Sequence, residues 1–226
     1  MKWELVCTLL VLCAGSLPAQ PAAPASAPTI PQPKPQVRSI VLGFSYLLPA
    51  GWEVVDTKPS LPKVQKQVEK DATTDAEMRG INCVQVALTA RHGSPASVVV
   101  VVALPFDCFG EQMTDKELPG FAQGALNGID GSFAVSGTVS ARYSLGAHSL
   151  WIERSKGNVK GHAEAEYTIE TVCSVLKKGA VCWMVMAADQ DALAAFEGGA
   201  VTLDGDAHPA LVPAAVFENK PSRGQR

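Results

Sequence analysis

The stretch of sequence that says most about the fold is VVVVVAL, residues 98–104, in which five valines follow one another. β-Branched residues favour extended backbone, and an unbroken apolar run of this length is typical of a strand buried on both faces. A turn signal, His92-Gly93-Ser94-Pro95, precedes the run. The run therefore predicts a central strand with a covering layer on each side.

The segments that follow this run predict further strands in adjacent hairpins. Four of them alternate or carry β-branched residues: 133–143, 148–154, 163–176 and 180–188. Lys177-Lys178-Gly179 is a tight-turn signal between the last two. Helices are expected after the capping box Thr114-Asp115-Lys116-Glu117 and after Asp189. Adjacent hairpins with a few helices predict an α+β domain on a mainly antiparallel sheet.

The composition excludes several classes of protein. The chain has 226 residues, of which 47% are hydrophobic and 18% charged, so disorder over its whole length is excluded. Its formal net charge of −3 provides no electrostatic footprint for nucleic acid, and no nucleic-acid partner is expected.

The two ends of the chain predict segments outside the folded domain. Residues 1–19 are interpreted as a signal peptide, because small residues up to Ala19 follow the apolar run Leu5–Leu12. The alternative is an uncleaved membrane anchor, although the run is shorter than the roughly 18–20 residues that a spanning helix needs. Seven prolines between positions 18 and 35 predict an extended spacer over residues 20–36.

The remaining residues divide into a domain and a tail. A single α+β domain is expected over residues 37–218, and the polar residues 219–226 are expected to be a disordered tail. Export to the periplasm or the medium follows from the signal peptide, and no transmembrane span is expected after its cleavage.

Four cysteines lie beyond the predicted signal peptide, and an even number in an exported protein predicts disulfides. Cys173 and Cys182 flank the predicted tight turn almost symmetrically, so that a hairpin places them nearly opposite each other. Cys83 and Cys108 then pair by elimination. Because each bridge lowers the entropy of the unfolded chain, it is expected to contribute about 2–4 kcal/mol to the free energy of unfolding.

The alternative for the cysteines is a reactive thiol, and Cys108 is the best candidate because its loop follows a predicted strand. A nucleophilic cysteine needs a histidine beside it, and His92, His148, His162 and His208 are all distant in sequence. Structural disulfides are therefore favoured. The alternative function is a small periplasmic enzyme, hydrolase or thiol-dependent, that uses Cys108 or an unrecognised serine.

Motifs that mark common catalytic and cofactor sites are absent from the sequence. It contains no G-x-S-x-G, H-E-x-x-H, Walker or G-x-G-x-x-G pattern. The pattern S-x-x-K occurs twice, at 60–63 and 174–177. The S-D-N and K-T-G motifs that accompany this pattern in the active sites of penicillin-binding proteins are absent. Zinc favours closely spaced ligands, whereas the histidines are scattered singly. The sequence therefore predicts no catalytic, cofactor-binding or metal-binding residues.

One group of residues is a candidate binding surface. Trp151 and Glu153 share a face of a predicted strand, and Trp183 lies on the next hairpin. An exposed tryptophan beside charged residues is a common interface anchor, so these three residues are the candidate surface. The alternative is a tryptophan half-buried under a helix.

A resemblance rests on FSYLLPAGWEV, residues 44–54. This stretch resembles the opening of PsbP/Mog1-like domains, in which an aromatic strand closes on P-x-G-W. Pro49 and Gly51 are expected to turn the chain between strands 40–48 and 52–55, which would form a hairpin, and Trp52 to cover the end of the core. The order of elements after it is also similar, over about residues 40–204.

The resemblance implies an α/β/α sandwich around a mainly antiparallel sheet. It also implies a non-catalytic binding or assembly role, and this chain would be one of the exported bacterial members, whose function is unknown. The expected partner is an unidentified protein or ligand of the cell envelope, and no cofactor is implied. No partner-contact residues of the family can be matched to this sequence.

Overall fold

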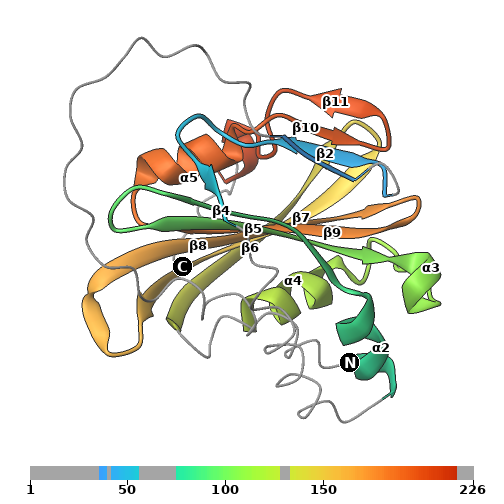
Figure 1. Cartoon of the computed structure of the whole chain (residues 1–226), viewed down its shortest axis with the longest axis horizontal. Coiled ribbons are helices and arrows are strands. Elements are labelled where there is room, and N and C mark those ends of the chain that lie inside the picture. The colour runs from blue at the N-terminus through green and yellow to red at the C-terminus, as the bar shows by residue number, and fades with distance from the viewer. Residues whose placement is uncertain (1–35, 40–41, 56–74, 128–132, 218–226) are drawn as a thin grey trace, which may run out of the picture.

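The structure, a computed structural model, describes residues 36–39, 42–55, 75–127 and 133–217, and within them the strands form two sheets (Figure 1). The larger sheet contains, in spatial order, β3 (Glu53–Val54), β4 (Gln85–His92), β5 (Ser97–Pro105), β9 (Gly179–Ala187), β8 (His162–Leu176), β7 (His148–Val159) and β6 (Phe133–Leu145). The smaller sheet contains β1 (Gln36–Ser39), β2 (Phe44–Leu47), β10 (Val201–Leu203) and β11 (Asp206–His208). All neighbouring strands among the described residues are antiparallel, which confirms the predicted fold class.

Different layers cover the two faces of the larger sheet (Figure 1). One layer consists of the helices α2 (Asp75–Cys83), α3 (Phe106–Phe109) and α4 (Leu118–Asn127). The other consists of the smaller sheet, the helix α5 (Gln190–Glu197) and the 3-10 turn η1 (Ala214–Val216). The molecule is therefore a sandwich, and one of its outer layers combines a helix with a second sheet. We call the two sides of the larger sheet the helix face and the small-sheet face.

Strand β5 contains the valine run and is buried on both sides, as predicted. Val99, Val101 and Ala103 belong to the core on the small-sheet face. Val100, Val102 and Leu104 belong to the core on the helix face. None of the six is more than 3% exposed. Because successive side chains of a strand alternate between faces, an unbroken apolar run supplies both cores from one strand.

The predicted helix starts are present near the expected residues. The Asp189 carboxylate accepts a hydrogen bond from the Ala192 amide at 2.7 Å and caps α5. The Thr114 amide donates to the Glu117 carboxylate at 2.7 Å, which is one half of a capping box. Helix α4 itself begins at Leu118, directly after Glu117.

The hairpin predicted for strands 40–48 and 52–55 is wrong. Strand β2 pairs with β1 and β10 in the smaller sheet, whereas β3 pairs with β4 at the edge of the larger sheet. The Pro49-Ala50-Gly51 turn carries the chain from one sheet to the other. Trp52 lies in the core there, 5% exposed, with its ring stacked on His92 at 5.5 Å between centroids.

Several predicted segments lie outside the described residues: the signal peptide (1–19), all of the spacer (20–36) except Gln36, and the tail (219–226). Strand β1 begins at Gln36, one residue before the predicted start of the domain. None of the helices in the described part of the chain has the length and apolar character needed to cross a membrane.

Candidate functional site

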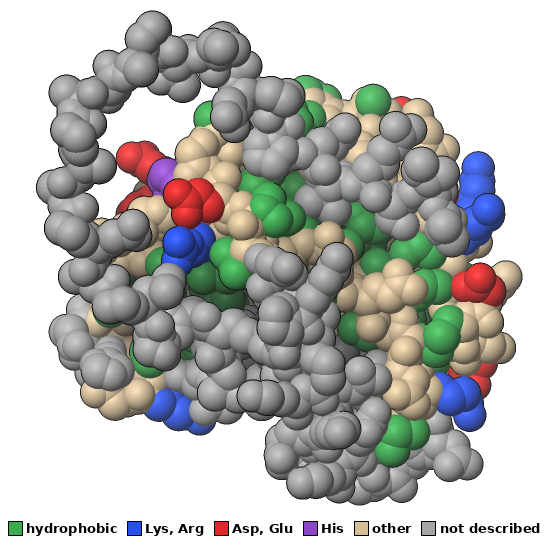
Figure 2. Space-filling model, viewed as in Figure 1, with side chains coloured by type: hydrophobic (Ala, Val, Ile, Leu, Met, Phe, Trp, Pro, Cys, Tyr) green, Lys and Arg blue, Asp and Glu red, His purple; other side chains and the backbone are tan. Residues whose placement is uncertain are grey.

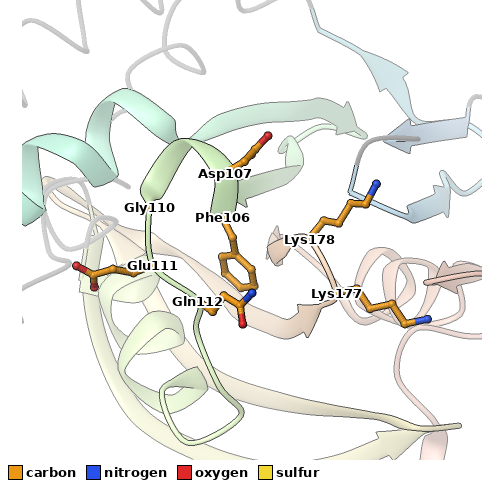
Figure 3. A pocket seen from close by; sticks show the side chains of 7 residues that line it. All are labelled: Phe106, Asp107, Gly110, Glu111, Gln112, Lys177 and Lys178. Carbon is orange, nitrogen blue, oxygen red and sulfur yellow. The ribbon is translucent and has the colours of Figure 1, made fainter.

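A hollow of about 550 Å³ opens between α3 and the turn that joins β8 to β9 (Figure 3). Its lining comes from two parts of the chain that are far apart in sequence: Phe106, Asp107, Gly110, Glu111 and Gln112, and the turn residues Lys177 and Lys178. This volume lies within the range of small-ligand sites. The sequence predicts these lysines only as part of a turn and does not predict the hollow.

Local geometry explains why α3 stands beside this turn. Pro105 ends β5 and is the N-cap of a single helical turn, and Gly110 ends it in the left-handed region at φ 81°. The Phe106 amide then donates to the Lys178 carbonyl at 3.0 Å. On the far side of the turn, the Lys177 amide donates to Asp204 at 3.0 Å. Backbone contacts therefore hold both walls of the hollow.

The two acids and two lysines that line the hollow differ in their contacts. Glu111 is paired with Arg79 of α2 at 3.3 Å, and in Figure 3 its side chain points away from the lysines. Lys177 and Lys178 have no ion-pair partner among the described residues, and both are exposed. In Figure 3 the Phe106 ring and the Gln112 amide lie between the lysines and Glu111. The hollow thus combines an aromatic ring, an amide, two lysines without an ion-pair partner among the described residues, and the Asp107 carboxylate, which accepts a hydrogen bond from the Cys108 amide at 3.0 Å.

Charges elsewhere on the described surface are mixed in sign. Figure 2 shows cationic and anionic side chains of the described residues interspersed on this face of the molecule. The lining of the hollow is also mixed in sign, with Asp107 and Glu111 on one side and the adjacent Lys177 and Lys178 on the other.

The four described cysteines form two bridges. Cys83, the last residue of α2, is bonded to Cys108 of α3, with 5.6 Å between their Cα atoms. Cys173 and Cys182 are direct cross-strand neighbours of β8 and β9 and are bonded to each other, with 4.2 Å between Cα atoms. In this structure Cys108 therefore has no free thiol to act as a nucleophile. The lining of the hollow beside it also contains no serine or histidine.

The residues predicted as a binding surface do not form one patch. Trp183 is fully buried in the core on the small-sheet face, where its ring meets Phe44 edge-on. Trp151 lies on the opposite, helix face, because it is the cross-strand partner of Cys173 and Cys173 is the partner of Cys182, the neighbour of Trp183. Trp183 is therefore a core residue, and its assignment to the surface is wrong.

Trp151 and Glu153 do lie together, but mostly beneath other residues. The Trp151 indole N–H donates to the Glu153 carboxylate at 3.0 Å, and the Arg142 guanidinium lies over the indole ring, 5.7 Å from its centroid. Trp151 is half-buried and Glu153 only 5% exposed. Burial raises the pKa of Glu153, and the bond from Trp151 opposes this shift. This pair is chiefly a structural contact of the helix face.

A buried ionic cluster on the small-sheet face was missed by the sequence analysis. Arg154 of β7 donates to the Glu170 carboxylate of β8 at 2.6 Å, and it also contacts the Glu197 carboxylate of α5. Its guanidinium lies 4.2 Å from the centroid of the Phe217 ring. Placing Arg154 on the face opposite Trp151 was possible from strand alternation, but its partners depend on the register of β8 and the position of α5.

Glu170 is the most deeply buried acid of this cluster, with its side chain 0% exposed. Burial raises its pKa to about 8, Arg154 opposes the shift, and the neighbouring Glu197 carboxylate adds to it. One oxygen of Glu170 accepts no hydrogen bond. With one arginine for two carboxylates, a protonated Glu170 leaves the cluster electrically neutral.

Among the described residues, no three His, Cys, Asp or Glu side chains gather in a way that could hold a metal ion.

Comparison with solved structures finds six similar chains, and one of them is a cyanobacterial PsbP. No protein-family model matches the sequence, and no curated protein matches it. The solution structure of cyanobacterial PsbP (CyanoP) from Synechocystis sp. PCC 6803 is 13% identical, covers 74% of this chain and 87% of its own, and has a TM-score of 0.40. The match concerns the PsbP part of the resemblance and not the Mog1 part.

Proposed function

We propose that the protein is an exported, non-catalytic binding or assembly module of the cell envelope, and that an acidic segment of its partner binds in the hollow beside α3. The observation that carries the proposal is the pair of unpaired lysines, Lys177 and Lys178, on one wall of a hollow with Phe106 at its floor. Carboxylates of a partner would meet these cations, and an apolar side chain would cover the ring.

Two further observations support a role in binding outside the cytoplasm. Both cysteine pairs are joined as disulfides, which persist in oxidising compartments. One of these bridges links α2 to α3, the helix that supplies the floor of the hollow. A surface held by a disulfide and by backbone contacts loses little conformational entropy when a partner binds.

Charge reversal in the producing cell tests this proposal. The protein is cross-linked to its neighbours in the envelope, and the yield of the cross-linked complex is compared between wild type and Lys178→Glu. We expect Lys178→Glu to lower the yield, and Lys177→Glu together with Lys178→Glu to abolish it. Both changes place acids where the partner's acids bind.

Lys160→Glu is the matched control. Lys160 is an exposed lysine in the turn at the other end of β8, so the same change in charge occurs far from the hollow. Its complex should form at the wild-type yield. Equal yields from Lys178→Glu and Lys160→Glu would refute the hollow as the binding site, and the absence of any defined complex from wild type would refute the binding role.

A further inference from the structure

Strand β6 forms one edge of the larger sheet, and it is unlike the other sheet edges. The opposite edge, β3, has 2 residues, and the edges of the smaller sheet, β1 and β11, have 4 and 3. β6 has 13 residues, and no strand of the described chain pairs with its outer side. Proteins usually keep sheet edges short, because an open row of backbone donors and acceptors can pair with another chain.

β6 also lacks most of the features that protect long edges. Its sequence, FAVSGTVSARYSL, contains no proline, and its one charged residue is Arg142. The Arg142 guanidinium folds over the Trp151 ring and donates to the Asp115 carbonyl at 2.9 Å, so it is held on the helix face. The protection that remains is a bulge between Ser136 and Val139, with Gly137 at φ 65°. Residues 139–145, beyond the bulge, form a regular edge.

An incomplete apolar row runs along this regular edge. Ala141 and Tyr143 pack against the core of the small-sheet face while remaining partly exposed. Val139 lies two residues earlier, on the same face by strand alternation, and is 41% exposed. Among the described residues, only Val139 and Val54 are large hydrophobic side chains with this degree of exposure. Among the described residues, the apolar row of this face therefore continues to the sheet edge and ends at the partly exposed Val139.

We propose that β6 pairs antiparallel with β6 of a second copy of this chain, so that two larger sheets join into one across a two-fold axis at Ala141. Identical strands satisfy each other's backbone groups when they pair antiparallel, and such a contact closes as a dimer. The two-fold axis stands perpendicular to the sheet, so both small-sheet faces lie on the same side. The apolar rows then run on from one copy into the other.

The register follows from charge and packing. With Ala141 on the axis, Val139 of each copy faces Tyr143 of the other, and aromatic with β-branched residues make favourable cross-strand pairs. Arg142 faces Ser140 of the other copy. An axis at Arg142 would set two arginines opposite each other, and an axis at Val139 would draw the bulge into the ladder. A second copy therefore fits this edge better with the axis at Ala141 than at Arg142 or Val139, in a ladder of residues 139–143 that leaves the bulge out.

Sedimentation equilibrium on the protein recovered after export tests the proposal over ~1 to ~200 µM. We expect a reversible dimer. Val139→Lys should weaken it about tenfold or more, because a charge replaces the apolar contact twice across the axis. Val54→Lys is the matched control: Val54 is 57% exposed at the opposite edge of the sheet, and its substitution should leave the dimer unchanged.

Substitutions at Ser140 test the register itself. Ser140 is exposed, so either charge is tolerated in the monomer. Ser140→Lys would face Arg142 of the other copy and weaken the dimer, whereas Ser140→Asp would strengthen it. A wild-type protein that stays monomeric at ~200 µM overturns the proposal. A dimer that Val139→Lys and Val54→Lys affect equally also overturns it, and so do shifts in the same direction from the two Ser140 variants.

Discussion

The two disulfides differ sharply in their exposure, and this difference predicts a stepwise reduction. Cys173 and Cys182 are both 0% exposed, whereas Cys108 is exposed and its partner Cys83 is 5% exposed. Thiol–disulfide exchange requires a thiolate to reach a sulfur atom. We therefore expect a mild reductant to open only the Cys83–Cys108 bridge in the folded protein. The buried bridge should open only after global unfolding.

The size of the stability loss follows from the loop that each bridge closes. Cys83 and Cys108 are 25 residues apart, which corresponds to about 3–4 kcal/mol of unfolded-state entropy at 25 °C. Cys173 and Cys182 are 9 residues apart, for which the same relation gives about 2.5 kcal/mol. The more accessible bridge is thus also the more stabilising one. Cys83→Ala with Cys108→Ser should lower the free energy of unfolding by about 3 kcal/mol or slightly more.

The assay combines thiol labelling with urea unfolding. The folded protein is alkylated without reductant, with mild reductant, and with reductant in urea, and the labelled cysteines are identified by peptide mass. We expect no label, then label on Cys83 and Cys108, then label on all four cysteines. Urea titrations then give the free energy of unfolding of three proteins: the oxidised wild type, the selectively reduced and alkylated protein, and the double variant.

Three outcomes would contradict these predictions. Alkylation of Cys83, Cys108, Cys173 or Cys182 in the folded protein before any reductant is added would show that the pairing is incomplete. Simultaneous opening of both bridges by the mild reductant would show that burial does not protect Cys173 and Cys182. A double variant as stable as the oxidised wild type would instead refute the loop-entropy argument for the first bridge.

Three further substitutions test particular contacts. Burial raises the pKa of Glu170 from 4.5 to about 8, so the folded state binds the proton of this carboxyl group more tightly than the unfolded state does. The free energy of unfolding of the wild type should therefore fall as the pH rises between these two pKa values. Glu170→Gln stays neutral and should flatten the profile of urea midpoint against pH; parallel profiles would contradict the assignment. In Gly199→Ala the new Cβ would lie 2.7 Å from the Tyr46 ring carbon Cζ, and we expect a loss of about 1–3 kcal/mol in thermal or urea unfolding. Gly120→Ala, in α4 with open space around the new Cβ, should instead raise stability by about 0.5–1 kcal/mol, and a loss there would show that Gly120 has a packing role.

Predictions from the sequence were most accurate where a local pattern is sufficient. The valine run predicted β5 because alternation within one strand is a local property. The turn at Lys177-Lys178-Gly179 predicted that Cys173 lies opposite Cys182, because a tight turn sets the register of its own hairpin. The Asp189 cap predicted the start of α5 for a similar reason.

Predictions failed where the outcome depends on pairing between distant segments. Trp151 and Trp183 were assigned to one surface, but their faces depend on two successive registers, β7 with β8 and β8 with β9. A shift of one residue in either register would move a tryptophan to the other face. The first of these ladders also contains an irregularity between Asn158 and Val159, which cannot be read from the alternation of side chains.

The sequence by itself determined the fold class, the central strand, the hairpin of Cys173 and Cys182 and the helix start at Asp189, because turns, caps and periodicity act over a few residues. Only the tertiary structure decided that β2 and β3 belong to different sheets, that α3 and the β8–β9 turn enclose a hollow, and that β6 is a long edge without a second partner strand among the described residues. These features depend on which distant segments bury one another's apolar faces. That choice is made by the chain as a whole.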